Sequence, residues 1–195
     1  MKRAVQILQK GGLVAFPTDT VYGIGAITFD GKAVESIYEA KNRPEEKAIP
    51  VLIGDVDDLA KVSRDLPEIA LKLAAHFWPG ALTLVVPKNP SIPESVSATE
   101  TVGVRMPDHP VARTLLKLAG PMAVTSANIS GKPSPSTAQE VFNQLGGRIA
   151  LILDGGKTPG GIPSTVVDCM GADPKILRVG PISKQEIQDV TGYEF

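Results

Sequence analysis

Apolar positions along the chain follow two spacings that alternate with each other. Residues 4–8 place their apolar side chains on one helix face, and Gly11-Gly12 follow, which predicts a short amphipathic helix that ends at the glycines. Residues 13–16 are all apolar and end at Pro17, as expected of a buried strand. The chain therefore begins with a helix and a strand in succession.

The same alternation continues to the C-terminus. Helical spacing returns at 34–41, Asp55 and Pro67 are placed to begin two further helices, and Thr137 with Glu140 and Ser183 with Glu186 have capping-box spacing. A proline at position 50 predicts that the strand containing it is an edge strand or begins irregularly. Apolar runs predict strands at 49–53, 82–86, 102–106, 122–125, 149–153, 165–168 and 176–179.

Helices that alternate with strands predict a mixed α/β fold. With 195 residues, the chain is long enough for a substantial core, and residues 1–195 are expected to form a single domain. The Pro- and Ser-rich segment 132–136 is too short to separate two domains and is expected to be a loop.

Composition bears on three classes of protein: those that bind nucleic acid, those held by disulfides and those that span a membrane. Lys and Arg number 20 against 21 Asp and Glu, and the pI is near 6.1, so the surface as a whole does not favour nucleic acid binding. The single cysteine, Cys169, excludes an internal disulfide and favours a reducing compartment. No apolar run approaches the roughly 20 residues of a membrane span. We expect a soluble, cytoplasmic protein that does not bind a membrane.

Several common chemistries are excluded by counting residues. The only histidines are His76 and His109, and neither accompanies a nucleophile elbow or a zinc motif. Gly155-Gly156-Lys157-Thr158 resembles the end of a phosphate loop, but Leu151 stands where its first glycine would be. A nucleotide would have to bind without the usual glycine motifs.

Small polar residues gather at the ends of predicted strands. Residues 125–131, Thr-Ser-Ala-Asn-Ile-Ser-Gly, follow an apolar run and place hydroxyls and an amide where open α/β sheets bind ligands. They are equally typical of a turn or an N-cap. Thr18 and Thr20 flank Asp19 and would share one side of an extended backbone, which suits a small polar ligand or a solvent-facing strand.

Cations form a second group of candidates. Segment 41–47 holds three of them after a predicted helix, which suits a polyphosphate or a solvated helix C-terminus. Arg105 closes an apolar strand, where an arginine is costly without an anionic partner. Ser164 precedes the predicted strand 165–168, and Arg178 lies within the last one.

Together these segments resemble the YrdC/TsaC family of threonylcarbamoyl-adenylate synthases. The strongest part of the resemblance is K-x-R followed far downstream by S-x-N, here Lys41 with Arg43 and Ser126 with Asn128. Residues 11–23, 77–83, 104–107 and 176–180 also match the family in the right order, so the resemblance covers nearly the whole chain.

The resemblance implies a twisted mixed sheet flanked by helices around a large concave cavity. It implies a nucleotidyltransferase that joins L-threonine, bicarbonate and ATP into threonylcarbamoyl-AMP and releases pyrophosphate. The product serves N6-threonylcarbamoyladenosine formation at position 37 of tRNA, so the expected partner is the threonylcarbamoyl transferase complex, with tRNA as a further candidate. Mg²⁺ is expected with ATP, held by phosphate oxygens and water rather than by protein ligands, with Asp19 as a candidate outer-shell contributor.

The resemblance also assigns roles to individual residues. The tetrad Lys41, Arg43, Ser126 and Asn128 is the expected catalytic group, with Lys41 adding positive potential near the phosphates. The implied L-threonine site is Thr20, Arg105, Ser126 and Ser164, and the implied ATP site is Arg43, Lys47, Thr101, Asn128, Ser136 and Arg178. Because Ser130 and Ser134 lie in the same loop as Ser136, they remain alternatives to it as the serine that contacts the nucleotide.

Two departures from the family pattern limit these expectations. Because the chain ends at Phe195, we expect it to resemble the short form of the family, without the extra C-terminal domain, and Asn42 stands where the family commonly has Gly. Asn tolerates the left-handed conformation, so little harm is expected. The alternatives are a YciO-type paralogue, a module of the hydrogenase-maturation carbamoyltransferases, and an RNA-binding module without catalysis. The carbamoyltransferase module is disfavoured by the absence of Cys-rich zinc modules, and RNA binding by the neutral charge and 5% aromatic content.

Overall fold

The computed structural model describes residues 1–44, 48–159, 162–171 and 173–194. The strands are β1 (Val14–Pro17), β2 (Tyr22–Ile27), β3 (Val51–Leu52), β4 (Leu82–Pro87), β5 (Thr101–Arg105), β6 (Met122–Ser126), β7 (Leu151–Ile152), β8 (Thr165–Asp168) and β9 (Lys175–Arg178). The helices are α1 (Lys2–Gln9), α2 (Gly31–Lys41), α3 (Leu59–Val62), α4 (Glu68–Phe77), α5 (Pro110–Ala119), α6 (Ala138–Leu145) and α7 (Lys184–Thr191), with a 3₁₀ turn, η1 (Val56–Asp58), before α3.

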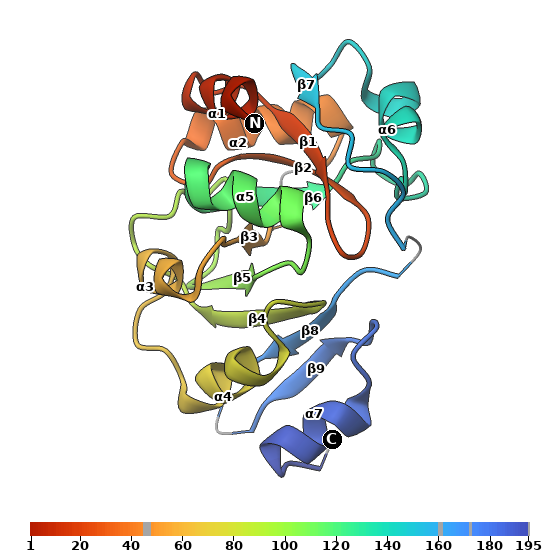
Figure 1. Cartoon of the computed structure of the whole chain (residues 1–195). Helices are drawn as coiled ribbons and strands as arrows, with labels where there is room; N and C mark the ends of the chain where they lie inside the picture. Colours follow the sequence, from red (N-terminus) through yellow and green to blue (C-terminus); the bar gives the residue numbers. More distant parts are fainter. Residues whose placement is uncertain (45–47, 160–161, 172, 195) are drawn as a thin grey trace.

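A single sheet of nine strands runs the length of the molecule, in the order β7-β1-β2-β6-β3-β5-β4-β8-β9. Figure 1 shows it descending from β7 at the top to β9 at the bottom. The pairs β1/β7, β3/β5 and β4/β8 are parallel, and the other neighbours are antiparallel. The expected α/β fold with a mixed sheet flanked by helices is therefore confirmed.

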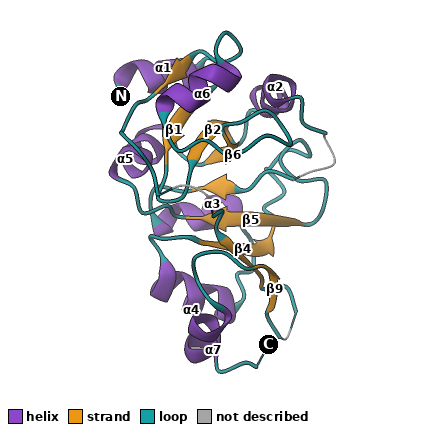
Figure 2. Cartoon of the chain, turned by 90° about the vertical axis from the view of Figure 1, so that its right-hand side faces the viewer, coloured by secondary structure: helices purple, strands orange, loops and turns teal. Residues whose placement is uncertain are grey.

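Alternate strand residues face the two sides of the sheet, as the period of a strand requires. Phe16 and Met122 pack with α1 and α5 on one side, whereas Ala15 and Ala123 belong to the core on the other side, which includes α2, α4 and α7. Figure 2 shows α1 and α5 on one side of the upper strands and α2 on the other. Helices α1 and α5 cover only part of their face of the sheet.

The predicted strands are all present, but three local expectations need correction. The strand after Pro50 is not at an edge, because β3 lies between β6 and β5. Pro50 directly precedes the strand, and its carbonyl accepts from the N–H of Val124 at 2.9 Å, which continues the pairing of β3 with β6. The helix capped by Asp55 is a 3₁₀ turn. The predicted capping box of Ser183 and Glu186 is complete. The one predicted at Thr137 is not, because the Glu140 carboxylate accepts from the N–H of Ser136 instead of from that of the N-cap Thr137.

Candidate active site

A cavity of about 390 Å³ opens on the part of the sheet face that α1 and α5 leave uncovered. Leu52 and Val124 line it and also pack beneath these two helices. The structure brings six of the predicted site residues to its wall: Thr20, Arg43, Arg105, Ser126, Ser164 and Arg178. Thr18 and Thr125, which belong to the two polar segments noted in the sequence, also line the cavity, as do Thr83 and Pro163, which we did not predict.

Strand order explains how distant segments meet at this cavity. The neighbours β5, β4, β8 and β9 carry, at or beside their ends, Arg105, Thr83, Ser164 and Arg178, in that order across the sheet. On the other side of the cavity, Gly23 of β2 pairs with Ser126 of β6. A Cβ on Gly23 would lie 2.7 Å from Cγ1 of Val124, so only glycine allows this close approach.

Thr18 and Thr20 share one side of the chain, but through a turn rather than an extended strand. Thr18 Oγ1 donates to the carbonyl of Val21 at 2.7 Å, so its bond of 3.0 Å to Thr20 Oγ1 must use the proton of Thr20. Thr20 Oγ1 also accepts from Arg105 Nη1 at 3.2 Å. The Thr20 hydroxyl therefore has one lone pair left, and it can act on a ligand only as an acceptor.

Arg105 is a buried cation, with only 6% of its surface exposed. It donates to the carbonyl of Gly80 at 2.9 Å, to Thr20, and to the Asp19 carboxylate at 2.5 Å. Burial lowers the pKa of its guanidinium, and the charge of Asp19 opposes that shift. Because a guanidinium has five N–H groups and these bonds use three, two remain for an anionic ligand.

Asp19 supplies the anionic partner that a buried arginine requires. We had expected Asp19 to be a candidate in the outer shell of Mg²⁺, and the structure shows that its carboxylate is paired with Arg105. Within the described ranges, no three or more His, Cys, Asp or Glu side chains are grouped in a way that could hold a metal ion.

Lys41 lies outside the cavity wall, at the end of α2, and its side chain is buried. Its ammonium donates to the carbonyl of Ser126, and to that of Asn128 at 2.6 Å, while its own carbonyl accepts from the N–H of Ser130 at 2.8 Å. Lys41 thus fastens loop 126–130 to α2.

Burial, followed by the nearby charge of Arg43, lowers the pKa of Lys41 from 10.5 to about 7. The folded protein therefore binds fewer protons at this site than the unfolded chain does between these two pH values. The free energy of unfolding should rise between about pH 7 and about pH 9, and this rise should be smaller in Lys41→Met. Urea denaturation of both proteins across this range measures the difference, and parallel pH profiles would contradict the assignment.

The other predicted residues differ in where they lie. Asn128 is buried, and its amide nitrogen donates to the carbonyls of Ile129 and Lys132, while its Oδ1 has no hydrogen-bond partner among the described residues. Thr101 belongs to a chain of hydroxyls with Thr99 at the start of β5. Neither Asn128 nor Thr101 is part of the cavity wall.

The three serines of the loop that we considered as nucleotide contacts, Ser130, Ser134 and Ser136, lie in different surroundings. Ser134 lines the cavity, whereas Ser136 donates its N–H and its hydroxyl to the Glu140 carboxylate at 2.6 and 3.2 Å. Ser130 lies outside the cavity wall and donates its N–H to Lys41. Lys47 falls outside the described residues.

Sequence and structure comparisons identify the family to which the chain belongs. The family model Sua5_yciO_yrdC, described as "Telomere recombination", matches residues 6–180. The chain belongs to the Sua5/YciO/YrdC family. The resemblance drawn from the K-x-R and S-x-N motifs is confirmed.

Members of the Sua5/YciO/YrdC family differ in length. The threonylcarbamoyl-AMP synthase of Bacillus subtilis is 47% identical over 193 residues, which are 97% of this chain and 56% of the relative. The structure described as Pyrococcus abyssi Sua5 complexed with L-threonine has a TM-score of 0.95 at 44% identity, covering 98% of this chain and 57% of that one. The structure of E. coli YciO has a TM-score of 0.85 at 28% identity, covering 95% of this chain and 91% of that one. The chain thus spans little more than half the length of the first two relatives.

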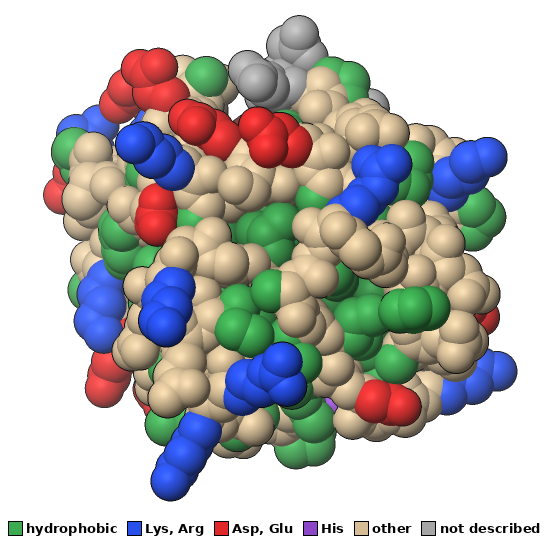
Figure 3. Space-filling model, turned by 90° about the horizontal axis from the view of Figure 1, so that it is seen from above, with side chains coloured by type: hydrophobic (Ala, Val, Ile, Leu, Met, Phe, Trp, Pro, Cys, Tyr) green, Lys and Arg blue, Asp and Glu red, His purple; other side chains and the backbone are tan. Residues whose placement is uncertain are grey.

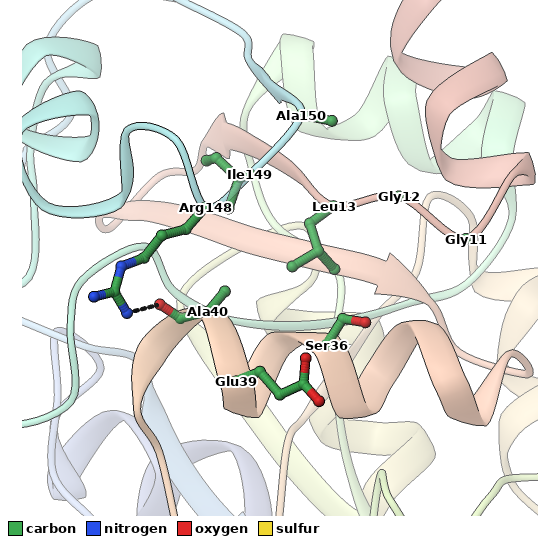
Figure 4. Close-up of a pocket in the computed structure, with 9 residues that line it drawn as sticks. All are labelled: Gly11, Gly12, Leu13, Ser36, Glu39, Ala40, Arg148, Ile149 and Ala150. Carbon is green, nitrogen blue, oxygen red and sulfur yellow. Dashed lines mark hydrogen bonds between the residues drawn. The ribbon is translucent and has the colours of Figure 1, made fainter.

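Asn42 has φ 50° and ψ 47°, the left-handed conformation that we expected asparagine to tolerate at this position. Its side chain accepts from Arg148 Nη1 at 3.1 Å, and the same nitrogen donates to the carbonyl of Ala40 at 3.2 Å. Figure 4 shows Arg148 reaching α2 beside a second hollow, of about 460 Å³, lined by residues 11–13, part of α2 and residues 148–150. Arg148 therefore caps the helix end from which Arg43 enters the cavity.

Arg148→Met should loosen this turn, lower the free energy of unfolding by about 1 kcal/mol, and raise the KM for ATP by about tenfold through Arg43. The KM for L-threonine should change less, because Ser126 is the one predicted threonine contact that is bonded to this helix end, through Lys41. Steady-state kinetics with each substrate varied in turn measures both values. Arg3→Met, at an exposed position on α1, is the matched control. An unchanged KM for ATP in Arg148→Met would show that the turn does not position Arg43.

Proposed function

We propose that this chain makes threonylcarbamoyl-AMP from L-threonine, bicarbonate and ATP and releases pyrophosphate, acting as a nucleotidyltransferase. The observation that carries the proposal is a cavity where Arg105, with two uncommitted N–H groups, faces the same space as Arg43, Arg178 and several small hydroxyls. An amino-acid carboxylate and a triphosphate are the anions that such a cavity suits. The names of the relatives and the L-threonine in the P. abyssi structure support this choice.

The reaction needs no nucleophile from the protein. The neutral amine of threonine takes up bicarbonate with loss of water to form a carbamate. A carbamate oxygen then attacks the α-phosphorus of ATP, and the bond to the β-phosphate bridging oxygen breaks as pyrophosphate leaves. Catalysis therefore rests on orientation and on the neutralisation of charge in the transition state.

Four cavity residues have a direct part in this proposal: Thr20, Arg43, Arg105 and Arg178. The two remaining N–H groups of Arg105 would bind the threonine carboxylate, and the free lone pair of Thr20 would accept an N–H from the threonine amine. Arg43 and Arg178 would bind the phosphates. Burial lowers the pKa of both guanidinium groups.

Mg²⁺ is proposed to enter with ATP and to neutralise phosphate charge when it is bound. Phosphate oxygens and water would supply its ligands, as is usual for this ion in nucleotide sites. Lys47, Thr101, Asn128 and Ser136 remain proposed contacts of the nucleotide, and the Oδ1 atom of Asn128 would accept a donor from it.

A YciO-type activity on another carbamoyl substrate is the second candidate, favoured by the structural similarity to E. coli YciO. RNA binding without catalysis has less support. The face of the molecule in Figure 3 mixes Lys and Arg with Asp and Glu around hydrophobic side chains instead of forming a basic patch. The described residues contain no helix with the length and apolar character needed to span a membrane. Transfer of the product to a threonylcarbamoyl transferase complex that modifies tRNA is proposed as the next step.

Release of pyrophosphate from ATP, measured with each amino acid in turn with and without bicarbonate, tests the proposal. Release should require both L-threonine and bicarbonate. Release that is independent of threonine, or that requires another carbamoyl acceptor, would favour the YciO-type activity. No release under any of these conditions, with a folded protein, would contradict both enzyme candidates.

A further inference from the structure

Thr83 is a polar residue in a strand whose neighbours are apolar. Leu82 and Leu84 face the core, whereas Thr83 faces the cavity, and only 5% of its surface is exposed. Its hydroxyl lies 2.7 Å from the hydroxyl of Ser164, which is equally buried and directly precedes β8. A buried hydroxyl needs a partner, and Ser164 is the one that Thr83 contacts.

The hydrogen bonds of Ser164 determine what it can offer a ligand. Arg178 donates from Nε to the carbonyl of Ser164 at 3.0 Å and from Nη2 to its hydroxyl at 3.3 Å. This second bond occupies one lone pair of the hydroxyl oxygen. If Thr83 donates to the other lone pair, the proton of Ser164 is left for the cavity.

The backbone beside Thr83 fixes the direction of its hydroxyl. A Cβ on Gly103 of β5 would lie 3.2 Å from the methyl carbon of Thr83, so the methyl group occupies the space that this glycine leaves. Because a β-branched side chain has few χ1 choices, a methyl group held there keeps the hydroxyl pointed at Ser164.

We propose that Thr83 is a positioning residue that donates its proton to Ser164 and thereby turns the Ser164 O–H toward a carboxylate or carbamate oxygen of the amino-acid substrate. The inference rests on the proposed function, in which Ser164 lies at the threonine site. Thr83 itself touches no substrate. Its effect reaches the substrate through Ser164 alone, and this makes the inference testable.

Thr83→Val keeps the shape of the side chain and removes its proton. This variant should weaken L-threonine binding, measured by calorimetry, by about tenfold, and it should raise the KM for L-threonine by about the same factor. A change of this size is expected because one hydrogen bond is lost. The Kd for ATP and the melting temperature should stay close to those of the unaltered protein. Thr83→Ser, which keeps the proton, should restore most of the affinity.

A double-mutant cycle with Ser164→Ala separates positioning from a general packing effect. Thr83→Val should have no further effect on L-threonine affinity in the Ser164→Ala background. An equal loss in both backgrounds, or an unchanged affinity in Thr83→Val, would overturn the inference. If Thr83→Val does not fold, the same cycle is run with Thr83→Ala. Absence of L-threonine binding to the unaltered protein would instead contradict the proposed function, so the two failures are distinguishable.

Discussion

Lys41→Met is expected to lower kcat/KM for pyrophosphate release by about a hundredfold, the effect of a displacement of about 1 Å in an active site. The reason is that the Lys41 ammonium holds the carbonyls of Ser126 and Asn128, and methionine has no donor for either. Of its three hydrogen bonds to Lys41, loop 126–130 then keeps only the one from the Ser130 N–H to the Lys41 carbonyl. Steady-state kinetics at saturating ATP measures the loss.

The same substitution should also destabilise the protein. Each carbonyl left buried without a donor costs about 1–3 kcal/mol, and removal of a costly buried charge offsets part of this, so we expect a net loss of about 1–3 kcal/mol. Lys32→Met on the exposed side of the same helix is the matched control and should change neither activity nor stability. Unchanged stability together with lost activity in Lys41→Met would instead favour a direct role of Lys41 at the phosphates.

Arg105→Ala is expected to raise the KM for L-threonine by a hundredfold or more, because two charge-assisted hydrogen bonds of about 1.5–3 kcal/mol each would be lost. The free energy of unfolding should fall by about 3 kcal/mol, since the partly buried Asp19 carboxylate would lose its partner. Calorimetry at low temperature, where the variant is still folded, separates binding from stability.

Two controls sharpen this prediction. Arg64→Ala breaks the exposed ion pair with Glu100 and should cost no more than about 1 kcal/mol. Asp19→Asn should destabilise the fold while it keeps L-threonine affinity, because the guanidinium of Arg105 remains. If Arg105→Ala left the KM for L-threonine unchanged, the carboxylate role of Arg105 would be wrong.

Hydrophobic spacing predicted most of the fold because the helices and strands of this chain bury regular faces. It missed β2, whose glycines weaken the strand pattern, although Gly23 is needed for close pairing with β6. It also missed α5. The sequence around His109 is typical of a turn, whereas its ring nitrogen accepts from the N–H of Val111 and caps the helix that begins at Pro110.

The residues of the candidate site could be predicted where they belong to a sequence motif. They were harder to predict where strand pairing or helix packing determines which side chains meet. The motif places Lys41 with the tetrad, but only the packing of α2 against loop 126–130 shows that its ammonium serves two carbonyls. Thr83 could have been noticed as a lone hydroxyl in an apolar strand. Its link to Ser164 depends on the pairing of β4 with β8, which spacing along one strand cannot give.

The most direct test of the proposed reaction is to follow carbon from bicarbonate into the product. The protein is incubated with ATP, L-threonine and isotopically labelled bicarbonate, and the nucleotides are separated and identified by mass spectrometry. We predict threonylcarbamoyl-AMP that carries the label, formed in equal amount with pyrophosphate and greatly reduced in Arg43→Ala. Pyrophosphate formed without a labelled threonine adduct of AMP would contradict the proposed reaction.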